Sequence, residues 1–233
     1  MLAKRGFVPE DERSFSPEGV ELIRIASRHV FYLINEGYDL KQATAFVGNR
    51  FQLTDRQRLA VMRSLATREQ LVGREKKRVG PGALAGRALW IDGFNTVITL
   101  EVAQCGSILF KGMDGCIRDL ASLRGTYRII PETEAAVRQM TSFLRSAGAG
   151  RSYILLDRPV SNSGRLKTLI AEIAEETRCE LDIQIIDDVD RALYGKEYVV
   201  TSDSIVLDRC VSWVDLTAEC AKQNGAAVLQ VWE

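Results

Sequence analysis

The chain has 233 residues, with 31 Lys and Arg, 31 Asp and Glu and one histidine, so its formal net charge is zero. An apolar fraction of 46% is typical of a folded globular protein and excludes disordered and collagen-like chains. The apolar runs are shorter than the roughly 18 residues that a membrane helix needs, and the N-terminus lacks the apolar stretch of a signal peptide. We therefore expect a cytoplasmic protein that does not contact a membrane.

The cysteines and the histidine restrict the chemistry further. The five cysteines form no CxxC pair, which excludes a thiolate zinc site and a disulfide framework. The single histidine, His29, excludes His-rich metal sites, and we interpret it as a structural residue. Carboxylates, hydroxyls and basic groups must then carry any reaction. A metal cofactor would be a hard ion such as Mg²⁺ or Mn²⁺.

The first 72 residues predict a helical, basic domain. Ser16 and Pro17 mark the start of a helix that Gly37 ends, and helices over residues 40–47 and 55–68 follow, the latter capped by Thr54. Residues 73–86 are charged and then rich in Gly and Pro, which indicates a linker. Residues 1–80 hold 15 Lys and Arg against 10 Asp and Glu, whereas residues 81–233 hold 16 against 21. A basic front half therefore precedes an acidic back half.

Beyond the linker, apolar strands alternate with helices, which predicts an α/β domain over residues 87–233. Its parallel sheet should be flanked by helices, and ligands should bind at the carboxyl ends of its strands. The expected strands cover residues 88–91, 107–110, 153–156, 181–186, 198–201 and 228–231, and the expected helices cover residues 132–147, 165–177 and 215–222.

Four of these strands are each followed by an aspartate: Asp92, Asp157, the run at residues 187–190, and Asp203. A lone Asp at such a place is commonly a helix cap. Several carboxylates at one edge of a parallel sheet repel each other unless a cation lies between them, so the set predicts a divalent-metal site. Gly93 would permit a tight turn after the first strand, so that Asp92 and Asn95 face a common ion or phosphate.

Two segments carry a resemblance to a known superfamily. The first strand ends in Ile-Asp-Gly-Phe-Asn (91–95), and the late strand continues as Val-Val-Thr-Ser-Asp-Ser-Ile-Val-Leu-Asp (199–208). This pattern resembles the PIN-like nucleases, including their NYN branch, which hold Mg²⁺ or Mn²⁺ on acids at strand ends and cleave RNA. Residues 47–58, 114–119 and 156–167 are similar to an uncharacterised prokaryotic family, domain of unknown function 434, which has no assigned activity.

The superfamily resemblance implies a set of catalytic acids. Asp92 matches the first-strand acid, Asp203 the acid of the late strand, and Asp208 an accessory acid. The remaining acid is open between Asp157, Asp114 and Asp119, and we favour Asp157 because it ends a strand. The implied metal ligands are Asp92, Asp157 and Asp203.

Two further groups could bind phosphate. The loop before the helix at residues 165–177 could form a cradle of hydroxyls and backbone N–H groups, or a simple helix cap. Arginines around the start of the helix at residues 55–68 could contact RNA phosphates, or form a solvated face that pairs with the acidic half. With Asn95, the phosphate-binding candidates are Ser161, Asn162, Ser163, Arg165, Arg50, Arg56 and Arg58.

The sequence thus favours a divalent-metal-dependent ribonuclease that cleaves RNA phosphodiesters. The main alternative is a non-catalytic module that binds RNA or a nucleotide on the same fold. A phosphate-transferring enzyme with an Asp nucleophile is weaker, because Asp92 has no second Asp two residues further on.

Overall fold

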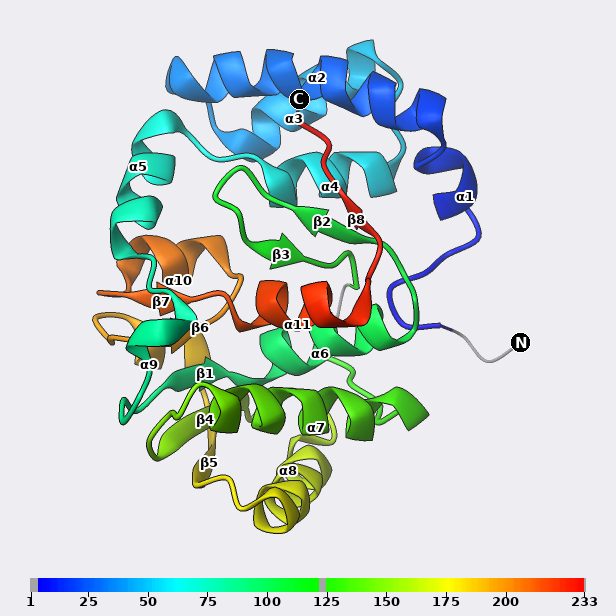
Figure 1. Cartoon of the computed structure of the whole chain (residues 1–233). Coiled ribbons are helices and arrows are strands. Elements are labelled where there is room, and N and C mark those ends of the chain that lie inside the picture. The colour runs from blue at the N-terminus through cyan, green and yellow to red at the C-terminus, as the bar shows by residue number, and fades with distance from the viewer. Residues whose placement is uncertain (1–3, 122–124, 233) are drawn as a thin grey trace.

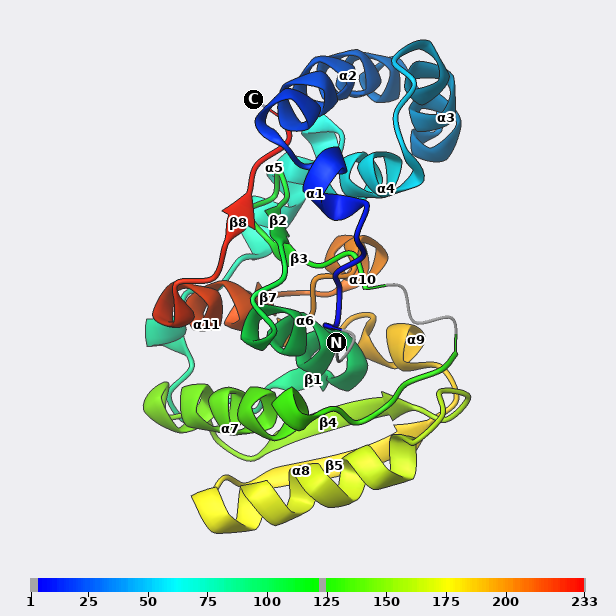
Figure 2. The same ribbon diagram turned by 90° about the vertical axis from the view of Figure 1, so that its right-hand side faces the viewer.

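A computed structural model describes residues 4–121 and 125–232. Helices from the N-terminal third of the chain lie at one end of the molecule, above a sheet covered by helices (Figures 1 and 2). The mixed α/β fold class expected from the sequence is confirmed. The N-terminal helices are α1 (Asp11–Ser14), α2 (Pro17–Asn35), α3 (Leu40–Arg50), α4 (Asp55–Ser64) and α5 (Arg68–Lys77).

Polar caps fix where these helices begin. The Ser16 side chain accepts a hydrogen bond from the Gly19 N–H at the start of α2, and Thr54 forms a capping box with Gln57 at the start of α4. A second capping box, between Thr67 and Gln70, starts α5. Because α5 continues to Lys77, the first five residues of the expected linker are helical, and the helix expected to reach residue 68 ends at residue 64.

The main sheet has five parallel strands in the order β5-β4-β1-β6-β7. In its register, Trp90 of β1 lies opposite Tyr153 of β4 on one side and Val199 of β6 on the other. Four of the expected strands are found here as β1, β4, β5 and β6, of which β6 is shorter than expected, whereas β7 was not expected. The strands are β1 (Trp90–Asp92), β4 (Ser152–Asp157), β5 (Leu181–Ile186), β6 (Val199–Val200) and β7 (Trp213–Val214).

Helices cover the sheet on both faces. The largest apolar core joins one face to α6, α7, α8 and α11, and a smaller core joins the other face to α9 and α10. The expected helices are found as α7, α8 and α11 with shifts of one or two residues at their ends. The six helices are α6 (Gly93–Gln104), α7 (Pro131–Ser146), α8 (Ser163–Thr177), α9 (Val189–Leu193), α10 (Ser204–Arg209) and α11 (Leu216–Asn224), and a short 3-10 turn, η1 (Pro81–Ala83), precedes β1.

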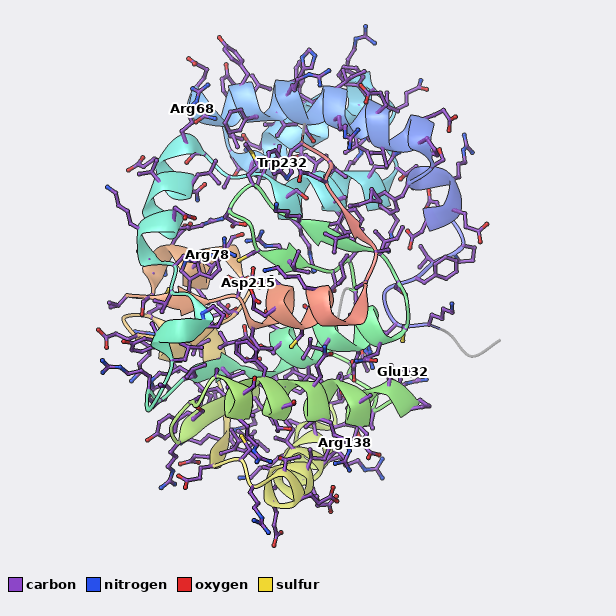
Figure 3. The ribbon with its side chains drawn as sticks, viewed as in Figure 1. Arg68, Arg78, Glu132, Arg138, Asp215 and Trp232 are labelled. Carbon is purple, nitrogen blue, oxygen red and sulfur yellow. The ribbon has the colours of Figure 1, made fainter. Side chains whose placement is uncertain are left out.

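A second, three-stranded sheet places the C-terminal segment of the chain against the N-terminal helices. The strands expected at residues 107–110 and 228–231 belong to it rather than to the main sheet, as β2 (Leu109–Lys111) and β8 (Val228–Leu229), and β3 (Ile117–Arg118) pairs with β2. Phe110 and Val231 complete the apolar core of the N-terminal helices. The Trp232 indole, labelled in Figure 3, donates to the Lys111 carbonyl at 2.8 Å. Within the described part of the chain, none of the helices combines the length and apolarity that crossing a bilayer requires.

Candidate active site at the carboxyl edge of the sheet

The strand order places a natural ligand position beside β1. From β1 the chain moves outward to β4 and β5, and it then returns to form β6 and β7 on the other side of β1. In open parallel sheets, ligands bind outside the carboxyl ends of the strands at such a reversal of direction. Asp92 ends β1, Asp157 ends β4, and Asp203 follows β6 by three residues. The sheet therefore brings the three predicted metal ligands to the same edge.

Asp92 is the most buried of these acids, with 5% of its surface exposed. It caps α6: one carboxylate oxygen accepts from the Asn95 N–H at 3.3 Å, and the other accepts from the Thr201 hydroxyl at 3.0 Å. Burial raises the pKa of Asp92 to about 7, and the negative charges of Asp190 and Asp157 act in the same direction.

Gly93 has a different role from the expected tight turn. It is the first residue of α6, in ordinary helical geometry, and it is not among the glycines with positive φ. A Cβ at this position would lie 2.8 Å from the Leu155 carbonyl oxygen and 2.5 Å from a Leu156 methyl carbon. Glycine is needed here because the start of α6 packs directly on β4, which holds Asp92 and Asn95 against the edge of the sheet.

Asn95 and Thr201 join the β1 and β6 loops. The Asn95 side-chain oxygen accepts from both the backbone N–H and the hydroxyl of Ser202, at 2.8 and 3.0 Å. The Thr201 hydroxyl accepts from the Asp203 N–H at 3.1 Å while it donates to Asp92. Among the described residues, no hydrogen bond uses the Asn95 amide nitrogen. This group is a donor at the edge of the sheet that is available to a ligand.

Asp203 caps α10, and a single oxygen of its carboxylate accepts from the Ile205 and Val206 N–H groups. Asp157 is half-buried at the end of β4; partial burial, with repulsion from Asp188, raises its pKa. Thus Asp92 and Asp203 both act as helix caps, as a lone Asp at a strand end often does, but they do so beside other carboxylates.

Asp190, in the first turn of α9, is a site residue that was not among the predicted ligands. Loss of hydration raises its pKa to about 6, with repulsion from Asp203, Asp157 and Asp188. The acidic run after β5 was visible in the sequence, but its position relative to β6 was not. We call Asp92, Asp157, Asp190 and Asp203 the acidic edge. The charges that act most strongly on the pKa values of Asp92, Asp157 and Asp190 are all negative.

The donor set of the acidic edge suits a hard divalent cation, since it consists of oxygen atoms with surplus negative charge. In the described residues, however, no group of three or more His, Cys, Asp and Glu side chains lies close enough together to hold a metal ion. Mg²⁺ commonly uses only one or two protein carboxylates and completes its shell with water and substrate phosphates. A Mg²⁺ site of that kind fits these residues, whereas a cage built from protein ligands does not.

The predicted accessory acid, Asp208, is engaged elsewhere. Both of its carboxylate oxygens accept from α5: Arg74 donates at 2.7 and 3.0 Å, and Gln70 donates at 2.9 Å. Arg74 itself is only 2% exposed and lies within the stretch expected to be a linker. The proposed accessory role of Asp208 is therefore not supported by its position, which is that of an anchor between α5 and α10.

The other two candidates for the remaining acid are also paired. Asp114 lies between the guanidinium groups of Arg74 and Arg118, at 2.7 and 2.6 Å. Although burial opposes ionisation, these two arginines hold the pKa of Asp114 below its usual value. Asp119 accepts from the Thr99 hydroxyl and faces Arg63. Asp157 as the remaining acid stays a prediction; among the described residues it is the only one of the three candidates that is not in an ion pair.

Asp114 and Arg118 nevertheless help to position the loop that follows β6. The Arg118 guanidinium donates to the Ser202 carbonyl at 2.8 Å and so fixes the loop that carries Asp203.

A fifth strand-end acid, Asp215 after β7, also differs from the acidic edge. Its carboxylate lies 3.9 Å from the Arg78 guanidinium (Figure 3).

The loop before α8 is held by the segment around Tyr127. The Ser161 hydroxyl and the Asn162 amide both donate to the Tyr127 carbonyl, at 3.1 and 2.7 Å. Asn162 has a left-handed backbone, and its side chain makes no cap hydrogen bond to α8. Ser163 and Arg165 lie in the first turn of α8. Ser161 and Asn162 thus have local partners, whereas a phosphate contact by Ser163 or Arg165 remains a prediction.

The three arginines expected to contact phosphate differ from one another. Arg56 forms a two-point ion pair with Asp11, at 2.7 and 2.8 Å, and donates to two backbone carbonyls. Arg58 donates to the Leu53 and Ala45 carbonyls and to Asn49. These bonds give Arg56 and Arg58 structural roles, and their contacts with phosphate stay a prediction. Arg50 is exposed, with its guanidinium over the Phe51 ring at 5.7 Å.

Comparison with known proteins divides the chain at α5. Residues 81–219 match the model of domain of unknown function DUF5616, and residues 22–77 match that of protein of unknown function DUF434. An uncharacterized protein of Methanocaldococcus jannaschii is 30% identical over 190 residues, which cover 81% of this chain and 91% of that protein. No solved structure matches the chain. The DUF434 resemblance is confirmed for the segment at residues 47–58, whereas residues 114–119 and 156–167 lie in the DUF5616 match. These matches contain no support for a PIN-like or NYN-like domain.

Proposed function

The chain belongs to the family of domain of unknown function DUF5616, and we propose that this domain is a divalent-cation-dependent ribonuclease whose site is the acidic edge. The observation that carries the proposal is the position of Asp92. It is a buried carboxyl at the topological switch point, with a pKa raised to about 7, and the charges that act most on it are those of other acids. Strongly perturbed carboxyls in such positions are typical of functional sites, because stability alone does not favour them.

The reaction class comes from the chemistry that these groups allow. Oxygen ligands and surplus negative charge favour Mg²⁺ or Mn²⁺ over softer metals. When bound, such an ion lowers the pKa of water and stabilises charge on the departing oxygen of a phosphodiester. The resemblance of the segments at residues 91–95 and 199–208 to PIN-like nucleases adds RNA as the substrate class.

The residues of the chain itself would position the substrate and the cation. The Asn95 amide can donate to a phosphate oxygen, because its own oxygen is already used by Ser202. Asp92, once ionised, would hold the cation, and the Thr201 hydroxyl keeps one of its carboxylate oxygens in place. Gly93 and Arg118 hold the β1 and β6 loops in register with each other.

The test is cleavage of single-stranded and structured RNA by the full chain, in Mg²⁺, in Mn²⁺ and in EDTA. We expect cleavage that EDTA abolishes and that Asp92→Asn and Asp203→Asn each reduce by at least 100-fold. Asp182→Asn is a matched control, since Asp182 lies near the amino end of β5, at the opposite edge of the sheet. Activity that survives both acidic-edge substitutions would refute the proposal.

A second candidate, a non-catalytic RNA-binding module, is favoured by one observation: the described residues contain no three-ligand metal group. It predicts RNA binding that depends on salt but is equal in Mg²⁺ and EDTA, without cleavage. Direct titration of Mn²⁺ into the protein separates the two candidates. The ribonuclease requires saturable binding that Asp92→Asn weakens, and the binding module does not.

A further inference from the structure

We infer that the groove between α2 and α3 binds single-stranded RNA by stacking bases on Tyr32 and Phe46. The choice of RNA rests on the proposed function, whereas the groove is lined by residues of α2 and α3, which lie apart from the main sheet in Figure 2. Its volume is about 380 Å³, and its lining includes Arg28, Tyr32 and Phe46.

Two large rings are exposed in this groove. Tyr32 is 65% exposed and Phe46 is 73% exposed, although the other large apolar side chains of α2 and α3 are buried or half-buried. Scattered apolar side chains on a surface need no explanation, but two rings that line one groove form a patch typical of a binding site. The sequence alone did not indicate this pair, because the two rings are 14 positions apart and come together only when α2 packs on α3.

Each ring has an arginine one helical turn away. Arg28 and Tyr32 are four residues apart on α2, and Phe46 and Arg50 are four residues apart on α3, so both pairs share a helix face. Arg28 and Arg50 are exposed, and neither forms an ion pair with a described residue. Arg28 lines the groove, and Arg50 lies over the Phe51 ring, one helical turn from Phe46. Both guanidinium groups are therefore available to phosphates near the two exposed rings.

The charge around the groove favours a polyanion. No acidic residue lines it, and α3 contains Lys41 and Arg50 but no Asp or Glu. The acids next to it along the chain are Glu36 and Asp39, which cap the adjoining ends of α2 and α3. Exposed rings combined with unpaired cations match the requirements of a single strand, whose bases are free to stack and whose phosphates follow the groove. A second copy of this chain would present the same cations and repel them.

The experiment measures anisotropy of a fluorescein-labelled 12-nucleotide single-stranded RNA with the full chain in EDTA, so that binding is read without cleavage. Stacking contributes enough per base that we expect Tyr32→Ala and Phe46→Ala each to weaken binding by about tenfold. Phe46→Trp, which keeps an aromatic ring at this position, should bind the RNA as tightly as the wild type. Arg50→Gln should lower the slope of log Kd against log salt by about 0.7, the value for one phosphate contact on a single strand.

Two controls separate stacking from general effects. Val211→Ala, a truncation at another exposed apolar residue (52% exposed), should leave binding unchanged. A duplex RNA of the same length, whose bases are not free to stack, should bind at least tenfold more weakly than the single strand. Equal binding of duplex and single strand would overturn the inference, as would unchanged affinity in both alanine variants. A dimer in solution that Phe46→Ala converts to monomer would also overturn it, and would assign the groove to contact between copies.

This inference and the proposed function can fail separately. Binding that needs Phe46, without cleavage in Mg²⁺ or Mn²⁺, would support the groove and refute the ribonuclease. Cleavage that needs Asp92 in a protein whose RNA affinity does not depend on Tyr32 or Phe46 would do the reverse.

Discussion

Replacing Asp92 with asparagine should stabilise the fold at alkaline pH. The carboxyl has a pKa of about 7 in the folded protein and 3.8 in the reference state, a difference of about three units. At about 1.4 kcal/mol per unit, ionised Asp92 destabilises the folded state by about 4 kcal/mol. Asparagine is neutral and can keep a cap hydrogen bond to Asn95 and a contact to Thr201. The variant therefore removes the cost of ionisation without removing the local hydrogen bonds.

The sign of the pH dependence follows from proton binding. Between about pH 4 and pH 7 the folded protein keeps a proton on Asp92 that the unfolded chain has released, so its stability falls as pH rises through this window. The stability gained by Asp92→Asn should then grow by about 2–3 kcal/mol between pH 5 and pH 8. For a chain of this size, that is roughly 5–10 °C in Tm.

Thermal unfolding in EDTA, followed by circular dichroism at pH 5 and pH 8, measures this difference. Asp114→Asn is a matched control with the opposite sign: Asp114 is also buried, but two arginines stabilise its charge, so its variant should lose stability at pH 8. An Asp92→Asn protein that is no more stable than wild type at pH 8, or that gains equally at both pH values, would refute the reasoning.

Three further predictions concern binding and packing. Mg²⁺ at 10 mM should stabilise the wild type by about 1.4 kcal/mol if it binds with a Kd of about 1 mM, and should stabilise Asp92→Asn less, as read from Tm. Gly93→Ala should lower the free energy of unfolding by about 1–3 kcal/mol, because its Cβ would clash with β4. Gly164→Ala in α8, where a Cβ meets open space, should raise it by up to about 1 kcal/mol, and urea unfolding measures both changes. Arg74→Met should lower the free energy of unfolding by about 3–5 kcal/mol, because it leaves buried Asp114 with one partner fewer. Arg158→Gln, which breaks an exposed ion pair, should lower it by less than about 1 kcal/mol.

Each of these predictions has a contradicting result. Equal Mg²⁺ stabilisation of wild type and Asp92→Asn would place the ion away from the acidic edge. A neutral Gly93→Ala would show that the start of α6 can move from β4. Equal losses in Arg74→Met and Arg158→Gln would mean that burial does not set the cost of breaking these pairs.

The sequence predicts well which acids reach the carboxyl edge of the main sheet, and poorly which acids are paired with arginines. Asp92 and Asp157 follow apolar runs long enough to be recognised as strands, and parallel strands bring their carboxyl ends together whatever their order. Asp208 could not be distinguished from Asp190 in this way. Which of them is neutralised depends on Arg74, 134 positions away from Asp208, and no local pattern reports that contact.

The errors in the secondary structure have local causes. The charged run after Gly73 looked like a linker, although the capping box of Thr67 and Gln70 already signals a helix. The strand near residue 108 was recognised, but an apolar run indicates a strand without indicating its sheet, and β2 pairs with β8 instead of β1. β7 has only two residues, too few for any periodicity to be seen.

The small sheet has a consequence for the order in which the protein is made. Val231 and Phe110 complete the apolar core of α2, α3 and α4. These helices leave the ribosome about 170 residues before residue 231, roughly 8–33 s earlier at ordinary rates of synthesis. Until then part of their apolar surface has no partner within the chain. We expect this half to depend on chaperones during translation, and to become resistant to proteases only once β8 has paired with β2.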